Sequence, residues 1–188
     1  RSMNEWPDDL HPVRGWMSVP QRLVELDGVV LLDTGLPVDA GLIRRAMAKL
    51  GFGPRDLKAI LLTHGHLDHA GSAAWVKAWS GAPVYAHAAE QAHIDGTFPY
   101  RGASRVCGVL EAVGRKVFGY APVKIDVAIK EGDELPFWGG LRVVQLPGHT
   151  IGHCGFYSAR HDLLCSGYAW VRLFMRTHVS PRIFSDAP

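Results

Sequence analysis

The sequence predicts an α+β fold in which β-sheets are covered by helices. Two observations carry this prediction: hairpin-like pairs of apolar runs, and strand patterns that are followed by helical patterns. Their mixture disfavours a purely parallel, doubly wound sheet. A chain of 188 residues has the size of one domain, and it can bury roughly 70% of its unfolded surface. We therefore expect a single domain over 1–188.

Strand and helix patterns alternate along the first half of the chain. Apolar runs at 22–26 and 29–32 flank Asp27-Gly28, a dipeptide typical of tight hairpin turns. Asp39 is a candidate cap for a helix whose apolar residues follow helical spacing over 42–50. The pattern then predicts a strand, a helix and a short strand at 59–63, 73–78 and 83–86.

The second half is richer in strand patterns. Apolar residues recur at spacings of three and four over 103–118, which predicts one further helix. We expect a turn at 131–133 and a polar turn around Arg160 that joins the last two strands. The predicted strands of this half are 124–130, 141–146, 154–158 and 162–165.

Composition argues against several classes of function. Hydrophobic residues make up 47% of the chain and charged residues 20%, and the net charge is +2. This balance favours neither a nucleic-acid partner nor an anionic membrane. No apolar run approaches the roughly 20 residues that span a bilayer, and no secretory signal is visible. The three cysteines are an odd, widely spaced set, so we expect no disulfides and a cytoplasmic protein.

The stretch His64-Gly65-His66-Leu67-Asp68-His69 carries the chemistry of the chain. It places four potential metal ligands within six residues, directly after the apolar run 59–62. Imidazole and carboxylate together favour zinc, iron or manganese over calcium or magnesium. His64 and His66 can point the same way from an extended turn, while Asp68 and His69 open a helix and can face a second point. The competing interpretation is a polar loop in a chain that has ten histidines.

A second candidate stretch is Leu146-Pro147-Gly148-His149-Thr150, which closes an apolar strand with a rigid turn. Like the first cluster, it presents an imidazole at the C-terminal end of a strand, so His149 is the natural third ligand beside His64 and His66. Three imidazoles leave a fourth position for water, which is the pattern of catalytic rather than structural zinc. His153 could orient His149 or Asp68 as a hydrogen-bond donor behind the ligands.

These motifs, together with Leu32-Asp33-Thr34-Gly35, resemble the metallo-β-lactamase superfamily of metal-dependent hydrolases, in order and in spacing over about 22–170. The resemblance implies a four-layer αββα sandwich with the site at one edge between the sheets. It implies that His64, His66 and His149 hold one metal and that Asp68 and His69 hold a second. Asp33 would be a buried residue that braces the metal loop. One or two zinc ions are the implied cofactor, with iron or manganese as alternatives.

The family mechanism agrees with the chemistry of these residues. A metal-bound water loses a proton near neutral pH because the cation stabilises hydroxide. The hydroxide then attacks a carbonyl or phosphoryl centre that the metal polarises. Asp68 is the candidate catalytic residue, since a carboxylate near the metal can relay a proton to the leaving group.

Two departures from the family pattern weaken the second metal position. The family places a bridging aspartate after a strand such as 163–167, and here Tyr168 stands in that place. The family's final histidine normally lies well downstream, whereas His178 comes early, and we expect the C-terminal part of the fold to be truncated. We expect the first position to bind metal and the second, left with Asp68 and His69, to be weak or empty. Tyr168 is either a substitution in a truncated copy or part of an altered mechanism.

The motifs and the two departures from the family pattern are compatible with two functions. The first is a hydrolase of an ester, thioester or lactone, similar to glyoxalase II or lactonases, that acts on a small-molecule acyl substrate. The alternative is a degenerate, non-catalytic member of the fold that binds at most one metal. We expect no nucleic-acid and no membrane partner. An exposed sheet edge left by the short C-terminus would favour a homodimer. The segment 94–105 is either a substrate cover or an ordinary surface loop.

Overall fold

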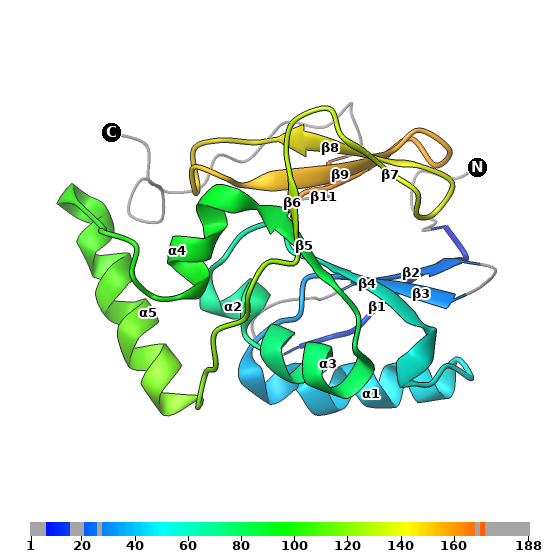
Figure 1. The fold of residues 1–188 in the computed structure, drawn as a ribbon, viewed down its shortest axis with the longest axis horizontal. Helices are drawn as coiled ribbons and strands as arrows, with labels where there is room; N and C mark the ends of the chain where they lie inside the picture. The colour runs from blue at the N-terminus through cyan, green and yellow to red at the C-terminus, as the bar shows by residue number, and fades with distance from the viewer. Residues whose placement is uncertain (1–6, 16–20, 26–27, 168–169, 172–188) are drawn as a thin grey trace.

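Two β-sheets pack face to face in the structure, a computed structural model that describes residues 7–15, 21–25, 28–167 and 170–171 (Figure 1). The first sheet has the order β1-β2-β3-β4-β5-β6. Its first two pairings are antiparallel, and the three pairings from β3 to β6 are parallel. Its strands are Leu10–Pro12 (β1), Gln21–Glu25 (β2), Gly28–Leu32 (β3), Leu57–Leu61 (β4), Val84–His87 (β5) and Val127–Ile129 (β6).

The second sheet is antiparallel throughout and has the order β11-β10-β9-β8-β7. Its strands lie within 134–171, after all the strands of the first sheet, so the two sheets come from successive parts of the sequence. Its strands are Glu134–Leu135 (β7), Leu141–Gln145 (β8), Cys154–Ser158 (β9), Leu163–Cys165 (β10) and Trp170–Val171 (β11).

Helices cover the outer face of the first sheet. The helices α1 and α3 lie along that face, and α5 stands at its side next to α2 and α4 (Figure 1). In the part of the chain that the structure describes, no helix covers the outer face of the second sheet, and none is long and apolar enough to cross a membrane. The helices are Ala40–Lys49 (α1), Leu67–Ala70 (α2), Ala73–Ser80 (α3), Gln91–Ile94 (α4) and Arg105–Val117 (α5).

The first sheet is buried on both faces, which explains its continuous apolar runs. Val30 and Leu32 of β3 face the second sheet, where they join a core that includes Phe156. Their neighbours Val29 and Leu31 face the helices and join a second core. The strands β3 and β4 therefore sit at the centre of the molecule, and the segments that leave them are held by both cores.

Contacts of Trp138 join the two sheets at the end of the sandwich where β9 turns into β10. The Trp138 backbone N–H donates to Glu25, and its indole Nε1 donates to Asp9 at 2.8 Å. The Trp138 ring also stacks on His161, with 4.2 Å between the ring centroids. The connection between β7 and β8 of the second sheet is thus hydrogen-bonded, through the buried Trp138, to Glu25 of β2 and to Asp9 next to β1.

The mixed sheet confirms the expected α+β arrangement, and the predicted hairpin, helices and central strands are present. Three differences are instructive. The strand expected over 124–130 is shorter, at β6. Asp39 stands at the start of α1, but its carboxylate accepts from the Leu36 backbone N–H at 2.9 Å and so closes the preceding turn instead of capping α1. The short elements β1, β7 and α4 carry too few residues to show a period.

Removing one large side chain from the core between the sheets should destabilise the whole domain. Phe156 is fully buried there, so Phe156→Ala is expected to lower the free energy of unfolding by about 3–5 kcal/mol in urea titration, because it removes apolar contacts and leaves a cavity. The matched change Arg44→Ala, on the exposed face of α1, should stay within about 0.5 kcal/mol. Equal effects of the two changes would contradict this assignment of the core.

Candidate metal centre

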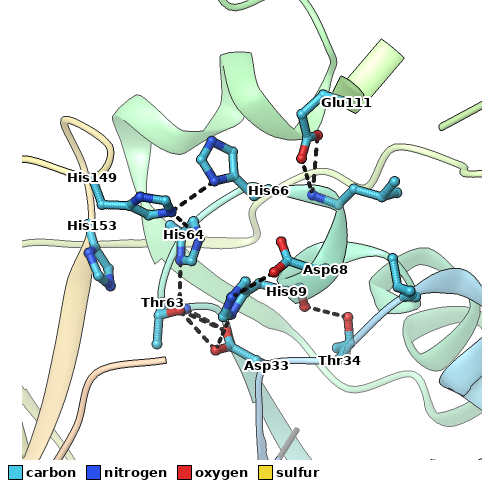
Figure 2. Close-up of polar contacts among 12 residues, drawn as sticks. Asp33, Thr34, Thr63, His64, His66, Asp68, His69, Glu111, His149 and His153 are labelled. Carbon is cyan, nitrogen blue, oxygen red and sulfur yellow. Dashed lines mark hydrogen bonds and ion pairs between the residues drawn. The ribbon is translucent and has the colours of Figure 1, made fainter. Parts of the chain in front are cut away.

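The candidate ligands lie where strands of both sheets end. His64 to His69 follow β4 and run into α2, Asp33 follows β3, and His149 follows β8. The close-up in Figure 2 shows the imidazole rings of His64, His66 and His149 turned toward one another. The parallel strands β3 and β4 end at the same edge of their sheet, which brings Asp33 beside the histidine loop.

Three imidazole nitrogens converge on one point. His149 Nε2 lies 3.1 Å from His64 Nε2 and 3.0 Å from His66 Nδ1. All three residues are buried, and they form a group whose ligand atoms lie within 4.8 Å of one another. The structure therefore brings together the three residues that the sequence predicted as one ligand set.

The chemistry of this group fits a divalent cation. Tetrahedral zinc with bonds of about 2.0–2.1 Å places its ligand nitrogens about 3.3–3.4 Å apart, close to the observed spacing. Burial, reinforced by the neighbouring imidazoles, lowers the pKa of His64 and of His66 well below 6.5, so both rings are neutral. His66 Nε2 is a buried atom without a hydrogen-bond partner among the described residues, which agrees with Nδ1 being the nitrogen that faces the shared point.

Asp33 fixes the orientation of His64 through Thr63. The Asp33 carboxylate accepts from the Thr63 backbone N–H at 2.8 Å and from its hydroxyl at 2.9 Å. Because the hydroxyl hydrogen is used there, Thr63 Oγ1 accepts from His64 Nδ1, 3.0 Å away. That hydrogen bond leaves the lone pair of His64 on Nε2, the nitrogen that faces His149. Asp33 thus stands where a brace of the metal loop is needed.

A second potential set combines His64 with Asp68 and His69. His69 lies between two carboxylates, with Nδ1 2.8 Å from Asp33 and Nε2 3.4 Å from Asp68. Burial alone would lower the pKa of His69, but Asp68 and Asp33 outweigh it and raise that pKa to about 10. His69 therefore holds a proton where a second cation would need a lone pair, which makes this set less ready for metal than the first.

His153 takes a different partner from the expected one. Its Nε2 donates to the Ser166 carbonyl at 2.9 Å, so this hydrogen bond ties the start of β9 to the end of β10 and does not orient His149 or Asp68. Tyr168 and His178, the two departures from the family pattern, lie outside the described residues. Gly167, by contrast, lies directly against the Asp33–Thr63 pair: an added Cβ would come 2.6 Å from Thr63 Oγ1.

Three buried or half-buried charged residues around the ligand loops escaped the sequence analysis. Glu90 accepts from backbone N–H groups of both loops. On α5, Glu111 accepts from the Leu67 N–H at 3.0 Å, and Arg115 pairs with Glu111 at 2.9 Å. The spacing of four between Glu111 and Arg115 in a predicted helix was the available signal. No comparable pattern surrounds Glu90.

A cavity of about 320 Å³ opens beside the centre, between α5 and the segment 94–105. Phe98 and Tyr100 of that segment line it together with His93, on whose ring Phe98 stacks at 3.8 Å. The His93 ring lies 5.2 Å from that of His66. The segment considered as a substrate cover therefore contributes aromatic walls next to a candidate ligand.

Comparison with known proteins gives one consistent result. The family model described as the metallo-beta-lactamase superfamily matches residues 23–167. The chain is 33% identical over 146 residues to a probable metallo-hydrolase, YflN, of Bacillus subtilis, a match that covers 74% of this chain and 54% of that protein. It is 35% identical over 114 residues to a hydroxyacylglutathione hydrolase of Bdellovibrio bacteriovorus, which covers 60% of this chain and 34% of the relative.

Solved structures agree with the sequence relatives. A metallo-beta-lactamase of Cronobacter sakazakii with a HARLDQ motif superposes with a TM-score of 0.64 at 30% identity, over 79% of this chain and 54% of that chain. This likeness confirms the expected sandwich. The chain spans about half the length of the Bacillus subtilis and Cronobacter sakazakii proteins and about a third of the Bdellovibrio bacteriovorus protein.

The assignment of His149 rather than His153 as the third ligand can be tested directly. His149→Ala should weaken zinc binding by more than roughly 100-fold in calorimetric titration, since even changes behind the ligands cost 10–100-fold. His153→Ala should keep zinc, because its Nε2 contacts the Ser166 carbonyl. His161→Ala, at the opposite end of β9, controls for the loss of a ring. Loss of zinc with His153→Ala but not with His149→Ala would reverse the assignment.

Proposed function

The chain belongs to the metallo-beta-lactamase superfamily, and on that basis we propose that it is a metal-dependent hydrolase of an ester, thioester or lactone. The observation that carries the proposal is the convergence of His64, His66 and His149 at nitrogen–nitrogen distances of 3.0 and 3.1 Å. Three imidazole ligands with a further position open to solvent or substrate are typical of catalytic zinc.

His64 Nε2, His66 Nδ1 and His149 Nε2 would hold the cation. The donor set favours zinc, with iron or manganese as alternatives. When bound, such a cation supplies Lewis acidity, which lowers the pKa of a coordinated water to about 7 and polarises an acyl oxygen. The neutral state of the buried rings suits this role, because no proton must leave them before the cation binds.

Asp68 is the residue that we assign to proton transfer. Its carboxylate lies 3.4 Å from His69 Nε2, and its side chain keeps 20% of its surface exposed. A carboxylate at the rim of the centre can take up a proton on the oxygen that does not face His69 and deliver it to a leaving group. His69, fixed by Asp33, keeps Asp68 turned toward the centre.

The relatives favour an acyl substrate. One of them is named for the hydrolysis of a hydroxyacylglutathione, in which an acyl group is carried on sulfur. The cavity beside His66 is walled by Phe98 and Tyr100 and suits a small, partly apolar group. A net charge of +2 gives no electrostatic reason to expect a nucleic acid.

Two other functions stay open to test. Cleavage of a β-lactam is favoured by the similarity to the Cronobacter sakazakii enzyme. A non-catalytic protein that binds at most one metal is favoured by Tyr168, which stands where the family has an aspartate. A panel of substrates and the zinc content of Tyr168 variants separate these alternatives from the proposed hydrolase.

Metal removal should abolish the proposed activity. We expect the zinc-loaded protein to hydrolyse an acyl thioester or a lactone, followed by absorbance of the released thiol or by acid release. A chelator should remove this activity, and added zinc should restore it, because the cation supplies the Lewis acid. A cephalosporin in the same panel tests the β-lactamase alternative. Zinc binding without turnover of any substrate would favour the non-catalytic protein.

Restoring the family carboxylate should increase activity. Tyr168→Asp replaces a phenol by a group that can bridge two cations, so we expect a higher zinc stoichiometry by elemental analysis and a higher kcat with the same substrate. Tyr168→Phe serves as the matched control, since it removes the hydroxyl without adding a ligand. A Tyr168→Asp protein with unchanged stoichiometry and lower activity would instead point to a working role for the phenol.

A further inference from the structure

Glu90 connects the two loops that carry the candidate ligands. It ends the short 3-10 turn Ala88–Glu90 after β5, and its side chain is fully buried. Its Oε2 accepts from the Gly65 backbone N–H at 2.8 Å, and its Oε1 accepts from the Gly152 N–H at 2.9 Å. Gly65 separates His64 from His66, and Gly152 lies three residues after His149.

We propose that Glu90 is a positioning residue that sets the distance between the two ligand loops and thereby the affinity of the centre for its metal. This inference rests on the proposed function, since it assumes that His64, His66 and His149 bind a cation. One loop belongs to the first sheet and the other to the second, so the spacing of their ligands depends on what lies between them.

The chemistry of the contact requires a carboxylate. Both partners of Glu90 are backbone N–H donors, so both side-chain oxygens must accept. Glutamine has the same shape but offers one acceptor and one donor. In Glu90→Gln, the amide NH2 would face one of the two loops, and a buried N–H would lose its partner.

Both glycines are packed so closely that neither loop has room to shift toward Glu90. A Cβ at Gly65 would lie 2.7 Å from His93 Cβ and 2.8 Å from the Glu90 carbonyl oxygen. A Cβ at Gly152 would lie 2.7 Å from Glu90 Oε1 and equally close to His87 Nδ1. The segment 87–93 therefore acts as a spacer whose thickness is fixed by direct contact.

The other carboxylates around the centre act within one loop. Asp33 contacts Thr63 and His69, and Glu111 contacts Leu67, all of which belong to the loop after β4. The hydrogen bonds of Glu90, by contrast, reach both loops. Loss of Glu90 should therefore change the position of His149 relative to His64 more than loss of Glu111.

The test is the zinc affinity of the full chain, measured by competition with a chromophoric chelator on the metal-free protein. Glu90→Gln is expected to weaken zinc binding roughly 10–100-fold, the range found when a group behind the ligands is removed. The control is Asp39→Asn, another buried carboxylate, which accepts from the Leu36 backbone N–H in the turn before α1. Its zinc affinity should match that of the unchanged protein.

A second variant, Gly152→Ala, and the absorption spectrum of the cobalt-loaded protein test the same role of Glu90. If Glu90→Gln does not fold, Gly152→Ala displaces the second loop while the carboxylate stays, and it should weaken zinc binding in the same direction. With cobalt in place of zinc, both variants should change the visible absorption bands, which report ligand geometry. A folded Glu90→Gln protein that is less stable but binds zinc as tightly as the unchanged protein would overturn the inference. An unchanged protein that binds no zinc would overturn the proposed function itself.

Discussion

The arrangement of the centre depends on buried carboxylates that accept backbone N–H groups. Asp33, Glu90 and Glu111 each hold a different point of the loops that carry the histidines. A buried carboxylate is costly unless several donors surround it, and here those donors are backbone groups of the ligand loops. The burial of each carboxylate is therefore favourable only when the loop that supplies its N–H donors is folded. The same hydrogen bonds hold that loop in its position. The imidazole nitrogens of His64 and His66 can then lie 3.1 and 3.0 Å from His149 Nε2 without a strong attraction among the rings.

The two potential ligand sets differ in the state of their nitrogens. In the first, burial lowers the pKa of His64 and of His66 and keeps both rings neutral, and a hydrogen bond to Thr63 leaves the lone pair of His64 on the nitrogen that faces His149. In the second, His69 is paired with two carboxylates and holds its proton. The residues that remain after the loss of the family's bridging aspartate thus form an internal ion pair. This pairing is a second argument, independent of Tyr168, for the prediction that the second position binds metal more weakly than the first.

Local patterns were sufficient to predict the main elements and the ligands, because both leave a signal within a few residues. The apolar run before His64 and the Pro147-Gly148 turn before His149 each mark the end of a strand, where the sheet edge brings side chains together. Glu90 could not be found in this way. Its role depends on contacts with Gly65 and Gly152, which lie 25 and 62 positions away. The hydrogen bond from His153 to the Ser166 carbonyl and the one from the Leu36 N–H to Asp39 were missed for the same reason. Several donors and acceptors lie near each side chain in the sequence, and only the folded chain decides among them.

The two sheets are joined by different means at their two ends. Around Trp138, the contact is aromatic and is reinforced by hydrogen bonds to Asp9 and Glu25. At the opposite end, it runs through ligand loops, where a cation would complete the connection. The contacts at the Trp138 end are thus made by the protein alone, whereas part of the contact at the ligand end would depend on a bound ion. Because Glu90 and the Thr63 carbonyl already join the segments around the ligands without an ion, loss of the cation would loosen this end without separating the sheets, and the end around Trp138 would be unaffected.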